Sequence, residues 1–158
     1  MPAGEGAPEK QHGSDVTDRE AKTESDAVRL IDSSIWIHCD RKRNTHMKER
    51  LNALIIAGSA RVCWPVHTEL LIGVKNEAKW TTIDEGLSAI VHIPIADSTW
   101  RQASSWGWKL ARRGQTAPLV DLLIAAAAVE ANCMLWTSDS DFDRIASVSS
   151  LQLDRIRN

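Results

Sequence analysis

The sequence predicts an α/β fold of three layers, in which helices flank a central, mostly parallel sheet. Short apolar segments alternate with amphipathic stretches of helical spacing along most of the chain. This alternation is typical of parallel sheets that are covered on both faces. The length agrees, because 158 residues are enough for one domain with a substantial core and too few for two. Hydrophobic residues make up 43% of the chain and charged residues 25%, as in ordinary globular proteins.

Residues 1–27 are predicted to be a disordered acidic tail. This segment contains no Leu, Ile, Phe or Trp, and it carries seven acids against three bases. Without large apolar side chains it cannot bury enough surface to fold. The folded domain is therefore expected to span residues 28–158, which carry 14 acids and 16 bases. That mildly basic balance neither requires nor excludes a nucleic-acid partner.

The first half of the domain is expected to hold two strands and three helices. VRLID is a short buried strand by its pattern, and the serine pair that follows can cap a helix. Met47, Leu51 and Leu54 recur at helical spacing, and Gly58 can end that helix. Pro65 suits the first turn of another helix. The expected elements are strands at 28–32 and 60–64 and helices at 35–40, 46–58 and 66–73.

The second half continues the alternation and adds the most apolar helix of the chain. Trp80, Ile83 and Leu87 mark an amphipathic helix, and Asp97 and Gly114 can cap the next long one. Pro118 opens the apolar segment PLVDLLIAAAAVEA. The remaining expected elements are strands at 90–95 and 133–137, a short helix after the loop that starts at 138, and an edge strand within LQLDRI at 151–156.

Cysteine spacing and hydropathy predict a cytoplasmic protein. Cys39, Cys63 and Cys133 are widely spaced and form no CxxC pair, which favours reduced structural thiols over a zinc or redox site. No stretch approaches the roughly 18 consecutive apolar residues of a membrane span. The N-terminus also lacks the basic and apolar segments of an export signal. We therefore expect no membrane partner.

Acidic side chains stand at four places that a packed domain disfavours. Asp32 ends the first strand, Glu69 lies within VHTELLIG, Asp121 begins the apolar helix, and Asp139 and Asp141 lie in TSDSDF. In an open parallel sheet, ligands gather beyond the carboxyl ends of the strands, where Asp32 and Asp139 are expected. Asp121 and Glu69, near the starts of helices, can project into the same crevice from its flanks.

A cluster of these carboxylates would predict a metal-dependent nuclease. Their mutual repulsion would raise their pKa values and destabilise the fold unless a multivalent cation offset it. A set of oxygen ligands without paired histidines or cysteines favours Mg²⁺ or Mn²⁺ over zinc. No HExxH pattern surrounds His67 and Glu69, which argues against a zinc hydrolase. Such hard ions can activate water for attack on a phosphodiester.

Four motifs in order, LIDSSIW, TELLIG, VDLLIAAAA and TSDSDF, resemble those of PIN-domain proteins, particularly the VapC-type ribonuclease toxins of bacterial toxin–antitoxin pairs. The similarity spans roughly residues 28–145, and four motifs on the expected kinds of element form a fairly specific signal. The resemblance implies a PIN-like three-layer fold and RNA cleavage by a metal-activated water. It also implies inhibition by a cognate VapB-like antitoxin that covers the active site.

The resemblance also implies roles for individual residues. Matched by position, the family's acidic quartet, which is catalytic and binds Mg²⁺ or Mn²⁺, corresponds to Asp32, Glu69, Asp121 and Asp139. Asp141 is similar to the family's additional acid, so that the expected metal ligands are Asp32, Asp121, Asp139 and Asp141. Two polar positions that support the site correspond to Ser33 and Thr137.

Each acid also has a structural alternative. Asp121 can be a first-turn acid favoured by the helix dipole, and Asp32 can be a helix N-cap. Glu69 can be an exposed helix residue. Asp139 or Asp141 can cap the next helix, and at least one of them is expected to do so.

Basic residues and tryptophans are candidates for partner contacts. RNA phosphates could be bound by Arg41, Lys42, Arg43, Arg112 and Arg113, although a solvated loop or an antitoxin contact explains them equally well. Trp36, Trp64 and Trp136 follow apolar patterns and are predicted to be core residues. Trp100, Trp106 and Trp108 do not fit one helical face, which places some of them at an interface with a second copy or an antitoxin. We expect a homodimer.

The sequence thus predicts a metal-dependent endoribonuclease that acts as a toxin. One alternative is a non-catalytic PIN-like module that binds RNA or a partner, and the intact set of acids argues against it. The other is a DNA-directed metal nuclease, which the small size of the chain and the absence of further DNA-gripping segments disfavour.

Overall fold

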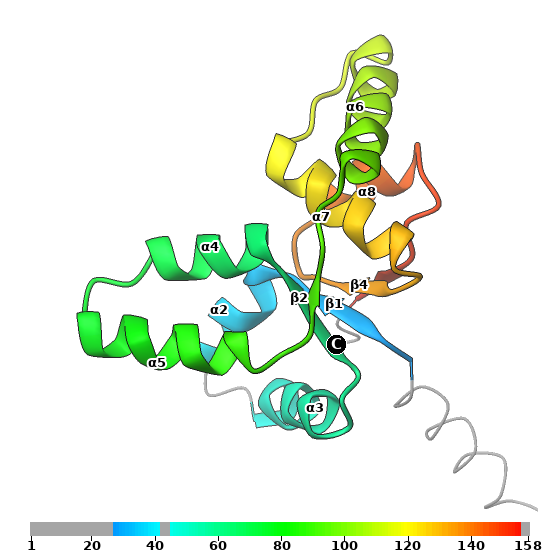
Figure 1. Ribbon diagram of the computed structural model, residues 1–158. Helices are drawn as coiled ribbons and strands as arrows, with labels where there is room; N and C mark the ends of the chain where they lie inside the picture. Colours follow the sequence, from blue (N-terminus) through cyan, green and yellow to red (C-terminus); the bar gives the residue numbers. More distant parts are fainter. Residues whose placement is uncertain (1–26, 42–44, 156–158) are drawn as a thin grey trace, which may run out of the picture.

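Five short parallel strands form the centre of the protein. The computed structural model describes residues 27–41 and 45–155 (Figure 1). The strands are β1 (Arg29–Ile31), β2 (Ala60–Cys63), β3 (His92–Ile93), β4 (Met134–Trp136) and β5 (Leu153–Asp154). They are arranged in the order β3-β2-β1-β4-β5, and all four pairings are parallel. The predicted α/β fold with a central parallel sheet is confirmed, whereas the expected acidic tail, apart from residue 27, lies outside the described residues.

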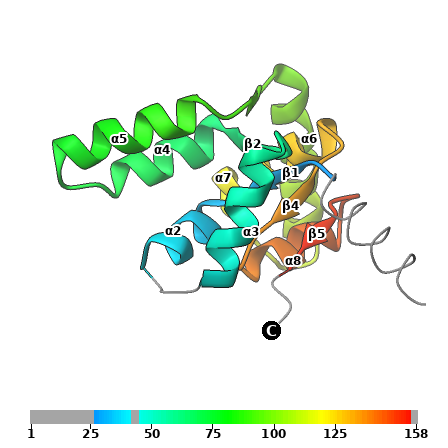
Figure 2. The ribbon, with the colours of Figure 1, turned by 90° about the horizontal axis from the view of Figure 1, so that it is seen from below.

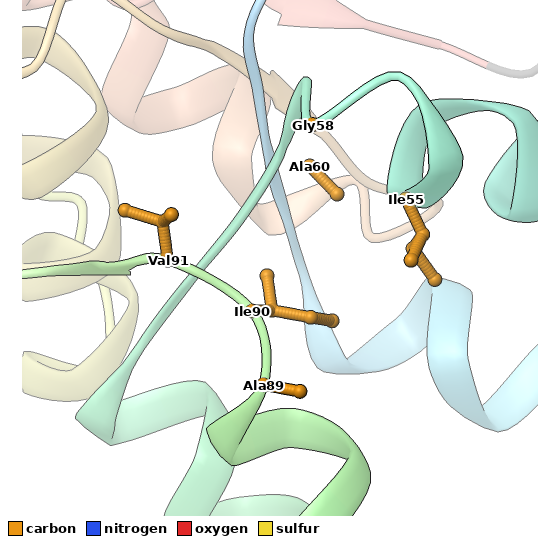
Figure 3. A pocket seen from close by; sticks show the side chains of 6 residues that line it. All are labelled: Ile55, Gly58, Ala60, Ala89, Ile90 and Val91. Carbon is orange, nitrogen blue, oxygen red and sulfur yellow. The ribbon is translucent and has the colours of Figure 1, made fainter.

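Helices cover both faces of this sheet. They are α2 (Ser33–Arg41), α3 (Thr45–Ile56), α4 (Trp64–Ile72), α5 (Glu77–Ser88), α6 (Asp97–Arg112), α7 (Leu119–Glu130) and α8 (Asp141–Ala146). Helices α6, α7 and α8 lie on one side of the sheet, and α3 lies on the other (Figures 1 and 2). Helices α4 and α5 lie side by side and project away from the strands in both views. None of the helices in the described part is both long and apolar enough to span a bilayer.

The core has two parts, one on each face of the sheet. Successive strand residues point to opposite faces, so Leu30 packs with the α6–α7–α8 side and Ile31 packs with α2 and α3. Helix α7 is buried at every position of 122–128, which explains why its sequence is almost wholly apolar. Its neighbour α6 comes close, since a Cβ atom on Gly107 would lie 3.1 Å from Cδ1 of Leu122. A Cβ atom at position 107 would therefore require the Leu122 side chain to shift by a few tenths of an ångström.

The predicted strands were too long at their ends. Strand β2 ends at Cys63, and Trp64 instead begins α4, with Pro65 in the first turn as expected. Because Trp64 lies on a helix rather than in the sheet, its side chain is 57% exposed, and its predicted place in the core was wrong. The strand expected at 90–95 is reduced to His92–Ile93, the only two residues there that pair with β2.

The other tryptophans divide between the core and the surface. Trp136 is fully buried, and Trp36 is partly buried and packs against both core clusters. Trp106 is buried on the inner side of α6. Trp100 and Trp108 are exposed, which agrees with the expectation that the three tryptophans of α6 do not share one face. The three cysteines are free and buried, as expected of structural thiols.

A buried ion pair attaches the edge strand β5 to the centre of the sheet. Arg29 is 2% exposed, and its Nε donates to Oδ2 of Asp154 at 2.5 Å. Arg50 of α3 donates to the same oxygen at 2.6 Å, and its guanidinium lies 4.5 Å from the centroid of the Trp136 ring. One carboxylate therefore joins β1, β5 and α3. Arg50 thus forms contacts within the fold.

Removal of the Asp154 carboxylate should strongly destabilise the fold. In Asp154→Ala the Arg29 guanidinium stays buried and loses its anion, a change that costs about 3–5 kcal/mol in comparable buried pairs. Urea unfolding followed by circular dichroism measures the loss. The control is Lys79→Ala, which breaks an exposed pair with Asp40 and should cost less than about 1 kcal/mol. Equal losses in the two variants would contradict the structural role of the buried pair.

Candidate active site

The candidate site lies at the carboxyl ends of the two central strands. Ile31 and Trp136 are register partners, so the residues that follow them, Asp32 and Thr137, lie side by side. Both are buried, and Oγ1 of Thr137 donates to Oδ2 of Asp32 at 2.9 Å. The structure thus places Asp32 where the sequence predicted it, beyond the end of the first strand.

Asp32 also caps the helix that follows it. Its Oδ2 accepts hydrogen bonds from the backbone N of Ser34 at 3.2 Å and from the Ser34 hydroxyl at 2.5 Å. The cap is therefore Asp32 and not the serine pair, so the expectation that the serines cap α2 was wrong. All three of these hydrogen bonds reach Oδ2, and Oδ1 accepts none among the described residues. Three hydrogen bonds therefore fix one oxygen of Asp32, and no described residue donates to the other.

The loop after β4 carries two more of the predicted acids. Oγ1 of Thr137 accepts from the backbone N of Asp139 at 3.0 Å, and Oδ1 of Asp139 accepts from the backbone N of Asp141 at 2.9 Å. Asp139 therefore shapes the loop before α8, but the N-cap of this helix is Ser140 without a side-chain cap hydrogen bond, so the expectation that Asp139 or Asp141 caps it was wrong. Asp141 forms an ion pair with Arg144 at 2.8 Å.

Three carboxylates come together at this point. Asp121, Asp139 and Asp141 each offer one oxygen, and these oxygens lie within 4.8 Å of one another. Asp121 reaches the group from the first turn of α7. Asp32 lies outside this tight group but close enough to raise the pKa of Asp121. The cluster fits a hard divalent cation, since its donors are oxygens only.

The electrostatics of Asp121 show how crowded the site is. Burial raises its pKa to about 7, with further contributions from the carboxylates of Asp139, Asp32, Glu69 and Asp141. The helix dipole favours an ionised acid in the first turn, but here burial and repulsion outweigh it. A bound cation would offset both effects.

Glu69 borders the same cluster from α4. Burial raises its pKa, the hydrogen bond from the Ser33 side chain lowers it, and the charge of Asp32 raises it further. Ser33 thus lies near Glu69, and its supporting role stays a prediction. Glu69 is also an exposed residue of α4, so the alternative of an exposed helix residue describes it as well.

The contacts of two residues near the site, Arg155 and Ser34, were not predicted. Nη1 of Arg155 donates to the backbone O of Asp139 at 2.6 Å, and its Nη2 donates to Oδ1 of Asp143 at 2.5 Å. This guanidinium holds the loop that carries the acids. The Ser34 hydroxyl accepts from the backbone N of Ser138 at 3.1 Å and so connects α2 to that loop. Ser34 could have been suspected from the serine pair, but no sequence signal marks Arg155.

The predicted RNA-binding cations lie at the ends of two helices. Arg41 is exposed at the end of α2, whereas Lys42 and Arg43 lie outside the described residues. Arg112 and Arg113 are exposed at the end of α6, next to the turn that leads into α7. That position brings them to the end of the α6–α7 pair at which Asp121 stands.

His67, two residues before Glu69, bonds to His92 and Asp84. Nδ1 of His67 lies 2.9 Å from Nε2 of His92, and Nε2 of His67 lies 2.9 Å from Oδ1 of Asp84. Both ring nitrogens of His67 are therefore engaged within the protein. This supports the argument against a zinc hydrolase built on His67 and Glu69.

Comparison with known proteins agrees with the geometry. The PIN domain family matches residues 29–148. The chain belongs to this family. Among curated relatives of this PIN-domain chain, a protein named VapC ribonuclease from Mycobacterium bovis is 29% identical over 132 residues, which cover 81% of the chain and 98% of the relative. Ribonuclease VapC51 of Mycobacterium tuberculosis is 31% identical over 121 residues, with 76% and 86% covered.

Solved structures share the fold. A DNA-bound VapBC of Salmonella typhimurium has a TM-score of 0.68 at 19% identity, with 82% of this chain and 98% of the other covered. VapBC-1 of nontypeable Haemophilus influenzae has a TM-score of 0.67 at 21% identity, with 81% and 97% covered. These likenesses confirm the predicted PIN-like architecture.

The raised pKa of Asp121 predicts a pH-dependent cost of the site. An unfolded aspartate titrates near 3.8 and the folded one near 7, so the folded state binds more protons between these values. Stability should therefore fall as pH rises from about 4 to about 7. Asp121→Asn lacks this titrating group. Its free energy of unfolding should therefore rise relative to that of the wild type between pH 4 and pH 8. Urea unfolding in EDTA measures the difference, with Asp40→Asn as control. A gap that does not change with pH would refute the role of Asp121.

The contacts of Arg155 predict that it positions the acidic loop. Arg155→Ala frees the backbone of Asp139 and the side chain of Asp143, so the carboxylates should lose their fixed spacing. We expect Mn²⁺ affinity, measured by isothermal titration calorimetry, to fall about 10- to 100-fold, as for other residues that orient metal ligands. The control Lys75→Ala removes the same charge from the exposed α4–α5 loop. Matching losses in both variants would point to net charge and not to positioning.

Proposed function

We propose that this PIN-domain protein is a metal-dependent endoribonuclease that acts as the toxin of a toxin–antitoxin pair. The observation that carries the proposal is the convergence of Asp121, Asp139 and Asp141 within 4.8 Å. The names of the relatives, VapC ribonucleases, support RNA as the substrate. The proposed catalytic residues are the four acids Asp32, Glu69, Asp121 and Asp139.

The proposed cofactor is Mg²⁺ or Mn²⁺, held by Asp32, Asp121, Asp139 and Asp141. Oxygen donors of this kind suit hard ions that retain water and recruit phosphate. When bound, a divalent ion activates a water molecule for attack on phosphorus and neutralises charge on the leaving oxygen.

The residues of the chain prepare the site for this chemistry. Thr137 and Ser34 hold Oδ2 of Asp32, so that its other oxygen keeps one position. Thr137 also fixes the backbone of Asp139. The pKa of Asp121 is raised to about 7, and a bound cation would lower it and favour the ionised carboxylate. Ser33 orients Glu69 at the border of the cluster.

The proposal extends to partners and place of action. Similar solved structures are VapBC complexes, which supports a VapB-like antitoxin that covers the active site. We also infer a homodimer, a nuclease domain over residues 28–158 with an acidic tail at 1–27, and action in the cytoplasm. The buried free cysteines support a reducing compartment. Exposed cations that can contact RNA phosphates are Arg41, Arg112 and Arg113, with Lys42 and Arg43 following in the sequence.

An RNA cleavage assay tests the function. Wild-type protein should cleave single-stranded RNA with Mg²⁺ or Mn²⁺, and EDTA should stop the reaction. Asp121→Asn should lower the rate by more than about 100-fold while the protein stays folded, because a ligand contributes more than the residues that orient it. Asp40→Asn, an exposed aspartate on α2 paired with Lys79, is the matched control.

Two outcomes would replace this proposal. Cleavage of DNA without cleavage of RNA would identify a DNA-directed nuclease. RNA binding without cleavage in the presence of any divalent ion would identify a binding module that retains the PIN fold but not the nuclease activity.

A further inference from the structure

The outward side of α6 carries two parallel rows of residues spaced four apart. Residues at this spacing lie one above the other along a helix. The first row is Trp100, Ser104, Trp108 and Arg112, and the second is Arg101, Ser105, Lys109 and Arg113. We call these eight residues the α6 face. The face combines aromatic rings with positive charge.

The tryptophans of this face are exposed although α6 is firmly packed. Trp100 is 47% and Trp108 65% exposed, whereas Ala103, Trp106 and Leu110 on the other side are buried. Trp106 thus fills the core position of this helix, and the other two rings contribute little to the core. Exposed apolar surface that is rimmed by polar residues, as along this row, is typical of a contact surface.

The first row leaves space between its rings. The Ser104 hydroxyl donates to the backbone O of Trp100 at 2.9 Å, so this small side chain lies along the helix and does not fill the gap. Trp100 and Trp108 are eight residues apart, or about 12 Å along the axis. The Arg112 guanidinium lies 5.9 Å from the centroid of the Trp108 ring and extends the row with a planar cation.

The charges of the face are uniform and largely unpaired. Within residues 27–41 and 45–155, no carboxylate forms an ion pair with Arg101, Lys109 or Arg112. Among the contacts of the described residues, Arg113 donates to the backbone O of Ser147 at 3.4 Å. The one acid of α6 is Asp97, its first residue. The face is therefore complementary to an anion along most of its length.

These features favour a polyanion with stacking bases as the partner of the α6 face. They disfavour a second copy of the chain as that partner. A twofold contact through this face would set the same cations against one another, which costs free energy. A single strand of RNA satisfies both rows, because its bases stack on aromatic rings and its phosphates pair with Arg and Lys.

The face also leads toward the acids. Gly107 packs close to Leu122, the residue after Asp121, and the end of α6 adjoins the turn that starts α7. We propose that the α6 face binds single-stranded RNA by stacking unpaired bases on Trp100 and Trp108, and thereby guides the strand to the acidic cluster. This rests on the proposed ribonuclease function and specifies its substrate as RNA with unpaired bases.

Binding of labelled RNA tests the face directly. The assay uses fluorescence anisotropy of a fluorescein-labelled, unstructured 12-nucleotide RNA, with Asp121→Asn as the background so that the RNA stays intact. Trp100→Ala and Trp108→Ala should each weaken binding about 5- to 150-fold, and Trp108→Phe should retain part of it. The matched control is Trp80→Ala, a 42% exposed tryptophan on α5. It should bind like the background protein.

Salt and duplex controls separate the two rows. Arg101→Gln and Lys109→Gln should each reduce the slope of log affinity against log salt by about 0.7. The same RNA annealed to its complement should bind with little dependence on the tryptophans, because its bases already stack within the helix.

Unchanged RNA affinity in both tryptophan variants would overturn the inference. So would a loss of affinity accompanied by a fall in molecular mass in light scattering, since the face would then be a protein interface. Failure of wild-type protein to cleave any RNA would instead remove the ribonuclease proposal. Cleavage by wild type, with an unaltered KM for long single strands in the tryptophan variants, would remove the α6 inference alone.

Discussion

The hydrogen bond between Thr137 and Asp32 is the contact on which the site depends. It joins the ends of β1 and β4, two strands that are more than one hundred residues apart in sequence and adjacent in the sheet. Thr137 uses the same hydroxyl oxygen to fix the backbone of Asp139. One threonine thus relates two of the acids to each other. The parallel register supplies this relation, because it places both strand ends at one edge.

The acids cost stability that the rest of the fold must supply. Asp121 stands beside seven consecutive buried residues of α7, where an apolar side chain would pack more favourably. The protein instead concentrates carboxylates there, and the pKa of Asp121 records the resulting conflict. A buried ion pair at Asp154 and an almost wholly apolar α7 keep the frame rigid around a site that repels itself. Such local conflict is typical of a functional site.

Sequence patterns predicted the elements and the acids for a physical reason. Strands and helices follow from local periodicity, and Asp32 and Asp139 could be placed because strand ends are visible in the sequence. The role of Ser34 depends on Ser138, 104 residues away, and that of Arg155 depends on Asp139, 16 residues away. No local pattern in the sequence encodes these side-chain contacts. Trp64 was misplaced because one residue at a strand–helix junction decides whether a ring faces the core or solvent.

The pair α6 and α7 shows how one hairpin can serve both stability and function. Helix α7 is buried nearly all round and carries a single acid in its first turn, whereas α6 is buried along one side only. Close packing at Gly107 fixes the outward face of α6 relative to Asp121. The Arg and Lys side chains of the α6 face can attract phosphate without neutralising the carboxylates, since none of them pairs with an acid of the described cluster. Opposite charges thus stay separated on one rigid unit, which a polyanion and a divalent cation could occupy together.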